Sequence, residues 1–189
     1  MRTLSLVAAT LALAIVAHFV LAQDKPAEKT PFSVGDSGKL TFTAPAGWTK
    51  KQPATKIVEA EFATPAAKGD ETPGRLTAMG AGGTVEDNIN RWVGQFAGEG
   101  GAAVKPKQDK LNVSGCEIHY VDLTGTYKDT PGGPFAGGKT TLRNDYRMLA
   151  AIVVTKDAGN YFLKLYGPKA TIGEAEAGFQ EMLKSLKVK

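Results

Sequence analysis

The sequence is poor in the residues that cross-link or bind metals, with one cysteine, Cys116, and two histidines in 189 residues. A single cysteine excludes an intramolecular disulfide, so the fold must be held together by its core. One cysteine and two histidines are also too few for a structural zinc site, which uses four such ligands. We expect Cys116 to be a small buried hydrophobe in a strand, with a reactive or intermolecular thiol as the alternative.

Long apolar runs are missing beyond the N-terminus. Residues 4–21 are nearly all apolar, follow Arg2 and end in the small-residue exit Val20-Leu21-Ala22. This order predicts a secretory signal peptide over residues 1–22. An uncleaved anchor is the alternative, since a run of about 18 residues is near the lower limit for crossing a bilayer. We therefore expect an exported protein, periplasmic or extracellular, with no stable membrane span after cleavage.

A strong excess of one charge is lacking as well. Lysine and arginine number 23 against 19 acidic residues, and the two signs are mixed along the chain. Such a surface disfavours nucleic acid as a partner. Residues 23–31 are small, charged and proline-containing, which predicts a disordered leader. Residues 32–189 are then of a usual size for a single domain.

Recognisable catalytic motifs are absent. The glycines of Gly80–Gly83 do not form a dinucleotide fingerprint, because position 85 is Val85, and no P-loop lysine follows them. Cys116 and His119 are three residues apart on a predicted strand, so they point to opposite faces and cannot form a nucleophile–base pair. No serine lies in a nucleophile elbow, and the acidic residues are too scattered for a metal cage. We predict a protein that is not an enzyme and has no cofactor or metal.

Alternating and helical patterns predict the secondary structure. Strands are expected at Lys39–Thr43, Ile57–Phe62, Arg75–Met79, Cys116–Tyr127, Tyr146–Thr155 and Asn160–Tyr166. The first helix begins with Thr84 as its cap, directs Asp87, Asn88 and Arg91 to solvent, and buries an apolar stripe of Val85, Ile89, Trp92, Val93 and Phe96. The second helix begins with a capping box of Thr171 and Glu174.

The resulting order is βββ-α-βββ-α, which predicts an α+β domain with an antiparallel sheet of about six strands. Met148–Val154 is apolar on both strand faces. Such a strand is central and covered on both sides. We therefore expect helices on both faces of the sheet, an α/β/α sandwich.

This order resembles the PsbP-like fold, whose members include an extrinsic subunit of photosystem II, a Ran-binding nuclear transport factor and exported bacterial proteins. The resemblance rests on Phe42–Trp48, with its Pro-x-Gly-Trp turn, on the strand-to-helix passage Met79–Trp92 and on the closing strand and helix Tyr161–Leu186. It implies a binding or assembly module rather than an enzyme.

The best candidate for a contact surface is the proline- and glycine-rich segment Lys128–Lys139 with its flanks. Aromatic residues beside arginine are favoured at interfaces. The candidate ligand- or partner-binding residues are Tyr127, Phe135, Arg143, Tyr146 and Arg147. The alternative is that the segment is only a surface connection and that Phe135 packs on the core of the domain.

The sequence thus favours a non-enzymatic binding or accessory module of the cell envelope, acting on a protein partner or a small ligand. A periplasmic carrier that holds a small apolar or anionic ligand between sheet and helix is the alternative. An enzyme of unrecognised type is the third hypothesis.

Overall fold

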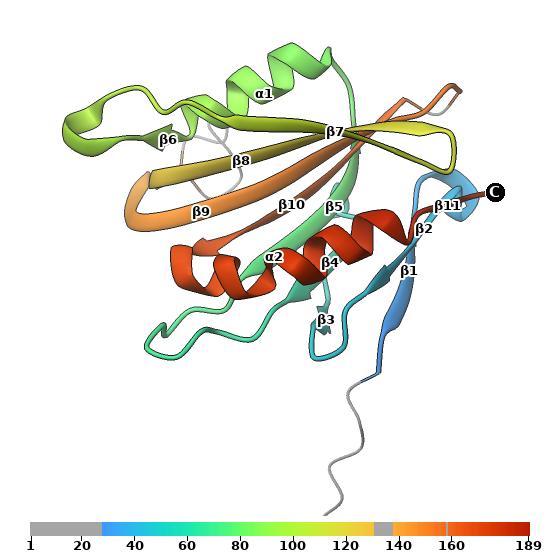
Figure 1. The fold of residues 1–189 in the computed structure, drawn as a ribbon, viewed down its shortest axis with the longest axis horizontal. Helices are drawn as coiled ribbons and strands as arrows, with labels where there is room; N and C mark the ends of the chain where they lie inside the picture. Colours follow the sequence, from blue (N-terminus) through green and yellow to red (C-terminus); the bar gives the residue numbers. More distant parts are fainter. Residues whose placement is uncertain (1–27, 131–137, 158) are drawn as a thin grey trace, which may run out of the picture.

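A computed structural model of the protein describes residues 28–130, 138–157 and 159–189. The strands of its larger sheet are β3 (Thr49–Lys51), β4 (Ala60–Ala63), β5 (Arg75–Ala81), β6 (Phe96–Ala97), β7 (Lys107–Val113), β8 (Cys116–Asp129), β9 (Thr141–Val154) and β10 (Asn160–Pro168). Their order across the sheet is β3-β4-β5-β10-β9-β8-β6, with β7 also paired to β8 (Figure 1). Every pairing in this sheet is antiparallel.

A smaller antiparallel sheet contains β1 (Thr30–Val34), β2 (Leu40–Ala44) and β11 (Lys187–Val188) in the order β1-β2-β11. Within the described residues the α-helices are α1 (Val85–Gly94) and α2 (Lys169–Lys184), and short 3-10 turns lie at Asp36–Gly38 and Glu99–Gly101. The α+β class and the antiparallel pairing are confirmed. The predicted strand number is wrong, because the larger sheet has eight strands rather than about six.

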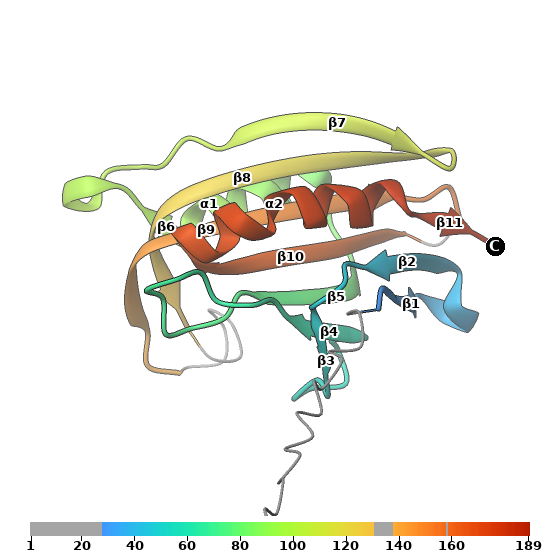
Figure 2. The same cartoon turned by 60° about the horizontal axis from the view of Figure 1, so that its bottom comes forward.

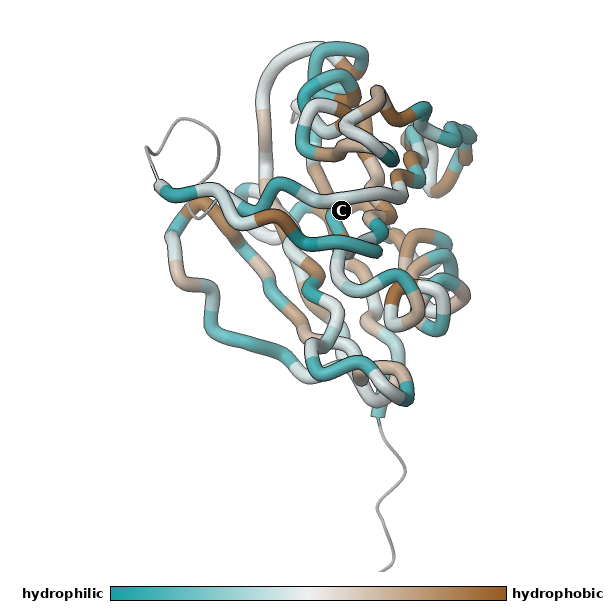
Figure 3. The backbone as a smooth tube through the Cα atoms, turned by 90° about the vertical axis from the view of Figure 1, so that its left-hand side faces the viewer, coloured by the Kyte–Doolittle hydropathy of each residue, from teal (hydrophilic) through white to brown (hydrophobic). Residues whose placement is uncertain are grey.

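The ends of the chain bear on two other predictions. The predicted signal peptide, residues 1–22, lies outside the described residues. Residues 23–31 were predicted to be a disordered leader. β1 nevertheless begins inside this segment, at Thr30, which pairs with Ala44 of β2. None of the helices in residues 28–130, 138–157 and 159–189 combines the length and hydropathy needed to span a bilayer. Figure 3 shows polar and apolar segments alternating along the described chain.

β9 lies between β8 and β10, and its apolar run is buried on both faces, as predicted. Successive side chains of a strand point to opposite faces, and β9 accordingly feeds two separate core clusters. One, which we call the α2-side core, contains Leu149, Ala151 and Val153 of β9, Phe179, Met182 and Leu183 of α2, and Phe32 and Phe42 of the small sheet. The other, which we call the α1-side core, contains Met148, Ala150 and Ile152 of β9 with Ile89 and Trp92 of α1. Figure 2 shows α2 in front of the sheet and α1 partly hidden behind β8.

The start of α1 agrees with the sequence prediction, apart from one residue. The Thr84 hydroxyl accepts a hydrogen bond from the Asp87 amide at 3.1 Å, which satisfies one free donor of the first turn. Asn88 was predicted to face solvent, but its side chain is buried. Its amide nitrogen donates to the carbonyl oxygens of Gly82 and Thr84, at 3.1 and 2.7 Å, which makes that burial tolerable.

The capping box predicted for α2 is wrong. The helix begins at Lys169, so Thr171 lies inside its first turn. The Thr171 hydroxyl is fully buried, donates to Asp70 Oδ2 at 2.6 Å and accepts from the Ala67 amide at 3.0 Å. Asp70 also accepts from the Thr171 amide at 3.1 Å. A carboxylate from a distant loop therefore satisfies the helix N-terminus, where negative charge is favourable.

Two glycines of α2 give a matched test of how the helix is seated. A Cβ atom at Gly173 would meet nothing within 4 Å, whereas one at Gly178 would lie 2.9 Å from Pro45 Cγ. We expect Gly173→Ala to raise the free energy of unfolding by about 0.5–1 kcal/mol, because alanine loses less backbone entropy on folding. Gly178→Ala is expected to leave the free energy of unfolding unchanged or to lower it, because the added Cβ atom would press on Pro45. Urea unfolding checks both variants, and equal gains would contradict the packing of α2 on Pro45.

Candidate binding groove

The structure does not bring the predicted contact residues together at one surface. Tyr127 and Tyr146 do meet, with ring centroids 6.0 Å apart and planes at 4°, and both belong to or pack on the α1-side core. Arg143 pairs with Asp129, with 3.3 Å between Nε and Oδ2. Phe135 lies outside the described residues.

Arg147 lies on the opposite face of the sheet from Tyr146, because adjacent strand residues point to opposite sides. Its guanidinium donates from Nε and Nη2 to the two carboxylate oxygens of Asp122, at 2.9 and 3.0 Å. Nη2 also lies 2.8 Å from Glu176 Oε2 on α2. The Arg147 and Asp122 side chains are only 15% and 10% exposed. These hydrogen bonds to Asp122 raise the pKa of Arg147 further above its usual value, so the guanidinium stays charged.

This Asp122–Arg147–Glu176 ion triad forms the floor of a groove between α2 and the β7–β8 hairpin, which we call the α2 groove. The groove consists of two adjoining hollows of about 650 and 450 Å³, which share Lys107, Asp122 and Arg147. Hollows of this size suit a small ligand or a chain segment. Further lining residues are Gly173, Gln180 and Lys184 of α2, Asp109 and Leu111 of β7, and Tyr120 of β8.

Tyr120 gives the α2 groove an unused polar group. Its hydroxyl is buried and makes no hydrogen bond of normal geometry among the residues that the structure describes, although the Gln180 side chain lies close to it. Burial, with smaller effects of the Glu176 and Asp122 carboxylates, raises the pKa of Tyr120 to about 12. The phenol therefore stays protonated at neutral pH and can donate to an acceptor placed in the groove.

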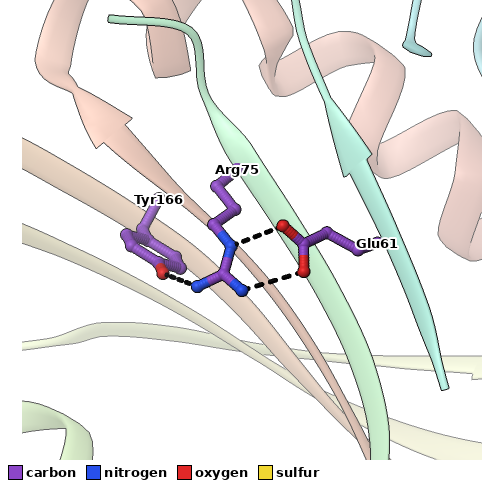
Figure 4. Close-up of polar contacts among 3 residues, drawn as sticks. All are labelled: Glu61, Arg75 and Tyr166. Carbon is purple, nitrogen blue, oxygen red and sulfur yellow. Dashed lines mark hydrogen bonds and ion pairs between the residues drawn. The ribbon is translucent and has the colours of Figure 1, made fainter. Parts of the chain in front are cut away.

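A second polar group lies on the α1 face of the sheet and was missed by sequence reasoning. Figure 4 shows Arg75 of β5 between Glu61 of β4 and Tyr166 of β10. Arg75 Nε and Nη2 each donate to a Glu61 oxygen at 2.8 Å, and Nη1 donates to the Tyr166 hydroxyl at 2.6 Å. These hydrogen bonds hold the pKa of Glu61 below its usual value.

Lys164 of β10 lies beside this group. Its ammonium nitrogen is 5.8 Å from the ring centroids of both Trp92 and Tyr166, and it donates to Gln95 Oε1 at 3.2 Å. Burial, and then the charges of Arg91 and Arg75, lower the pKa of Lys164 to about 8. We call Arg75, Trp92, Lys164 and Tyr166 the cation–aromatic cluster. The one sequence signal for it was a lone lysine within the mainly apolar strand Asn160–Pro168.

Cys116 and His119 lie on opposite sides of β8, as predicted. Cys116 is buried in the α2-side core, and burial raises the pKa of its thiol, which keeps it unreactive. His119 lines a hollow with Val85 and Ile89 on the α1 side. Its Nε2 lies 2.6 Å from Glu117 Oε1. Within the described residues, no three side chains of the metal-binding types come together.

Comparison with known proteins rests on structure, because no family model and no curated protein matches the sequence. The solution structure of cyanobacterial PsbP (CyanoP) from Synechocystis superposes with a TM-score of 0.52, at 12% identity, over 88% of this chain and 96% of that chain. The chain has the PsbP-like fold. LpqN of Mycobacterium tuberculosis, a protein involved in cell envelope biogenesis, superposes with a TM-score of 0.51, at 14% identity, over 88% of this chain and 93% of that one. Identities this low establish the fold alone.

Proposed function

We propose that this protein is an exported, non-enzymatic binding or accessory module of the cell envelope and that its partner binds in the α2 groove. The observation that carries the proposal is the groove itself, with a charged but internally paired floor and a buried tyrosine hydroxyl beside Gln180. A floor whose charges are already paired supplies orientation and hydrogen bonds rather than a nucleophile or a base. The likeness to LpqN, a protein of cell envelope biogenesis, supports an envelope role.

The sheet edge beside the groove favours a protein segment as the partner. β7 pairs only with β8 in the described sheet, so its outer backbone groups can accept a further strand. Leu111 pairs with Ile118 of the α2-side core, so Leu111 faces the groove. Alternate side chains of an added strand would lie on this same face. An extended segment bound at β7 would therefore reach into the groove.

The α2-side core and the α1-side core pack on opposite faces of β9, which suits a rigid display of this edge. The α2 helix forms one wall of the groove, and α1 belongs to the other core cluster. A partner at β7 therefore contacts one helix and the open hairpin.

The test is recovery of the partner from envelope extracts with the tagged protein lacking residues 1–22. Gly173→Trp fills the groove, since the position lines it and has open space around a Cβ atom. We expect this variant to recover at least about tenfold less partner, because a contact at the centre of an interface contributes more than about 1.4 kcal/mol. Gly173→Ala, changed at the same position without bulk, should recover the partner like the unchanged protein.

Any of three outcomes would overturn the proposal. Undiminished recovery by Gly173→Trp would place the partner elsewhere on the molecule. A small molecule retained in native mass spectrometry, with no protein recovered, would instead favour the carrier hypothesis. Hydrolase activity detected in the purified protein would exclude the non-enzymatic assignment.

A further inference from the structure

The cation–aromatic cluster lies on the sheet face opposite the α2 groove and has more positive than negative charge. Arg75 and Lys164 belong to neighbouring strands, and Arg91 of α1 lies close enough to lower the pKa of Lys164. Glu61 is the carboxylate in contact with this group, and both of its oxygens already accept from Arg75. Within the described residues, Glu61 is thus the one carboxylate in hydrogen-bond contact with this group of three cations, and Asp129, whose charge acts on Tyr166 from a distance, pairs with Arg143.

Lys164 has spare capacity to bind an anion. An ammonium group has three donors, and one of them is used by Gln95 Oε1. Within the part of the chain that the structure describes, Lys164 forms no ion pair, and its other close neighbours are the faces of Trp92 and Tyr166. The ring faces attract the ammonium but offer no oxygen acceptor, so an incoming oxyanion can accept from the two N–H groups that Gln95 leaves unused.

A hollow borders the cluster on the same face. A hollow of about 250 Å³ is lined by Gln95 and Tyr127, together with Lys128 of β8. Gln95 is the residue that hydrogen-bonds Lys164, and the Tyr127 ring lies 5.4 Å from the Tyr166 ring. The hollow thus ends at Gln95 and Tyr127, two residues that contact the cluster, and an anion in it would reach Lys164 by displacing the Gln95 side chain.

We propose that the cation–aromatic cluster binds a small organic carboxylate, with its oxyanion on the Lys164 ammonium and its flat apolar part against the tyrosine rings beside the hollow. The combination of an ammonium donor with stacked aromatic side chains fits this class better than a compact inorganic anion. This site is separate from the α2 groove, so it does not depend on the proposed function.

Binding should depend on pH because Lys164 must be protonated to hold the anion. With its pKa at about 8, Lys164 is mostly charged at pH 7 and about one-tenth charged at pH 9. Affinity for a benzoate probe should therefore be about tenfold weaker at pH 9 than at pH 7. The other titratable or charged groups near the cluster are Arg91 of α1, Arg75 of β5, Glu61 of β4, Lys128 and Asp129 of β8, Tyr127 of β8 and Tyr146 of β9, and Tyr166 of β10. Burial raises the pKa of Tyr127 and Tyr166, so both rings stay neutral over this range.

The experiment titrates the protein with sodium benzoate and sodium sulfate by calorimetry at pH 7 and pH 9, with sodium chloride at matched ionic strength as the reference. We expect saturable benzoate binding at pH 7, stronger than sulfate binding and weakened about tenfold at pH 9. Lys164→Met should abolish it, and Lys164→Arg should keep it while removing the pH dependence, because arginine stays charged. Lys187→Met, an exposed lysine of β11, is the matched control and should bind normally.

Benzoate heat indistinguishable from chloride, or binding that persists in Lys164→Met, would overturn the proposal. Sulfate binding as strong as benzoate binding would overturn the organic-carboxylate assignment. The circular dichroism spectrum of Lys164→Met shows whether loss of binding reflects unfolding. If that variant is unfolded, the pH dependence of benzoate binding by Lys164→Arg decides the question. Because neither lysine variant alters Gly173, partner recovery through the α2 groove tests the proposed function separately.

Discussion

Replacing Phe179 with alanine is expected to lower the free energy of unfolding by about 3–5 kcal/mol. Phe179 is fully buried in the middle of α2, and its ring lies 6.2 Å from the Tyr120 ring of β8. The same core cluster includes Leu149 of β9 and Phe42 of the small sheet. Truncation would therefore open a cavity where the helix and both sheets meet. Since small domains are stable by only about 5–15 kcal/mol, this one change removes a large share of the total.

Urea unfolding followed by circular dichroism measures the effect. Glu174→Ala, at an exposed position of the same helix, should change stability by less than about 0.5 kcal/mol and serves as the control. Phe179→Leu should fall between the two, because leucine fills part of the cavity. A loss below about 1 kcal/mol for Phe179→Ala would show that α2 is not seated on the sheet as described.

The parts of the fold that the sequence predicts well are those whose burial leaves a pattern. The apolar run in β9 is buried on both faces, and it was correctly placed in the interior of the sheet. In α1, Ile89 and Trp92 repeat at helical spacing and both face the core. In each case the hydrophobic period and the backbone period agree, so local sequence suffices.

The missed strands lack such a pattern. β7 is exposed along most of its length, so its outward residues Lys107, Gln108 and Asp109 carry no apolar signal. β3 is exposed at all three of its residues. These strands exist because a neighbouring strand supplies their hydrogen bonds, which is a long-range effect that no local window contains. Undercounting them made the predicted sheet smaller than the observed one.

The candidate sites were harder still, because they depend on strand register. Glu61, Arg75 and Tyr166 come from three strands, and Tyr166 is far from the other two in the sequence. Only the pairing of Arg75 with Tyr166 across β5 and β10 brings them together. The reverse error affected Tyr146 and Arg147, which are adjacent in the sequence and were expected to share a surface. Strand geometry places them on opposite faces.

Replacing Arg147 with alanine is expected to lower the free energy of unfolding by about 2–4 kcal/mol. The variant leaves the Asp122 carboxylate, which is only 10% exposed, without its bidentate partner. Glu176 is 35% exposed and can turn to water, so Glu176→Ala should cost less than about 1 kcal/mol. Urea unfolding of the two variants compares the buried and the exposed halves of the ion triad, and equal losses would contradict the burial of Asp122.

The double variant Asp122→Leu with Arg147→Met separates the two roles that the triad can have. An apolar pair of similar volume is often as stable as a buried ion pair, so the double variant should regain most of the stability lost by Arg147→Ala. The shape of the α2 groove is then preserved while its charges are gone. If the partner binds to the charged side chains of the groove floor, its recovery should fall although the protein is stable. If recovery is unchanged, the triad holds α2 against β8 and β9, and recognition depends on the groove walls and the β7 edge.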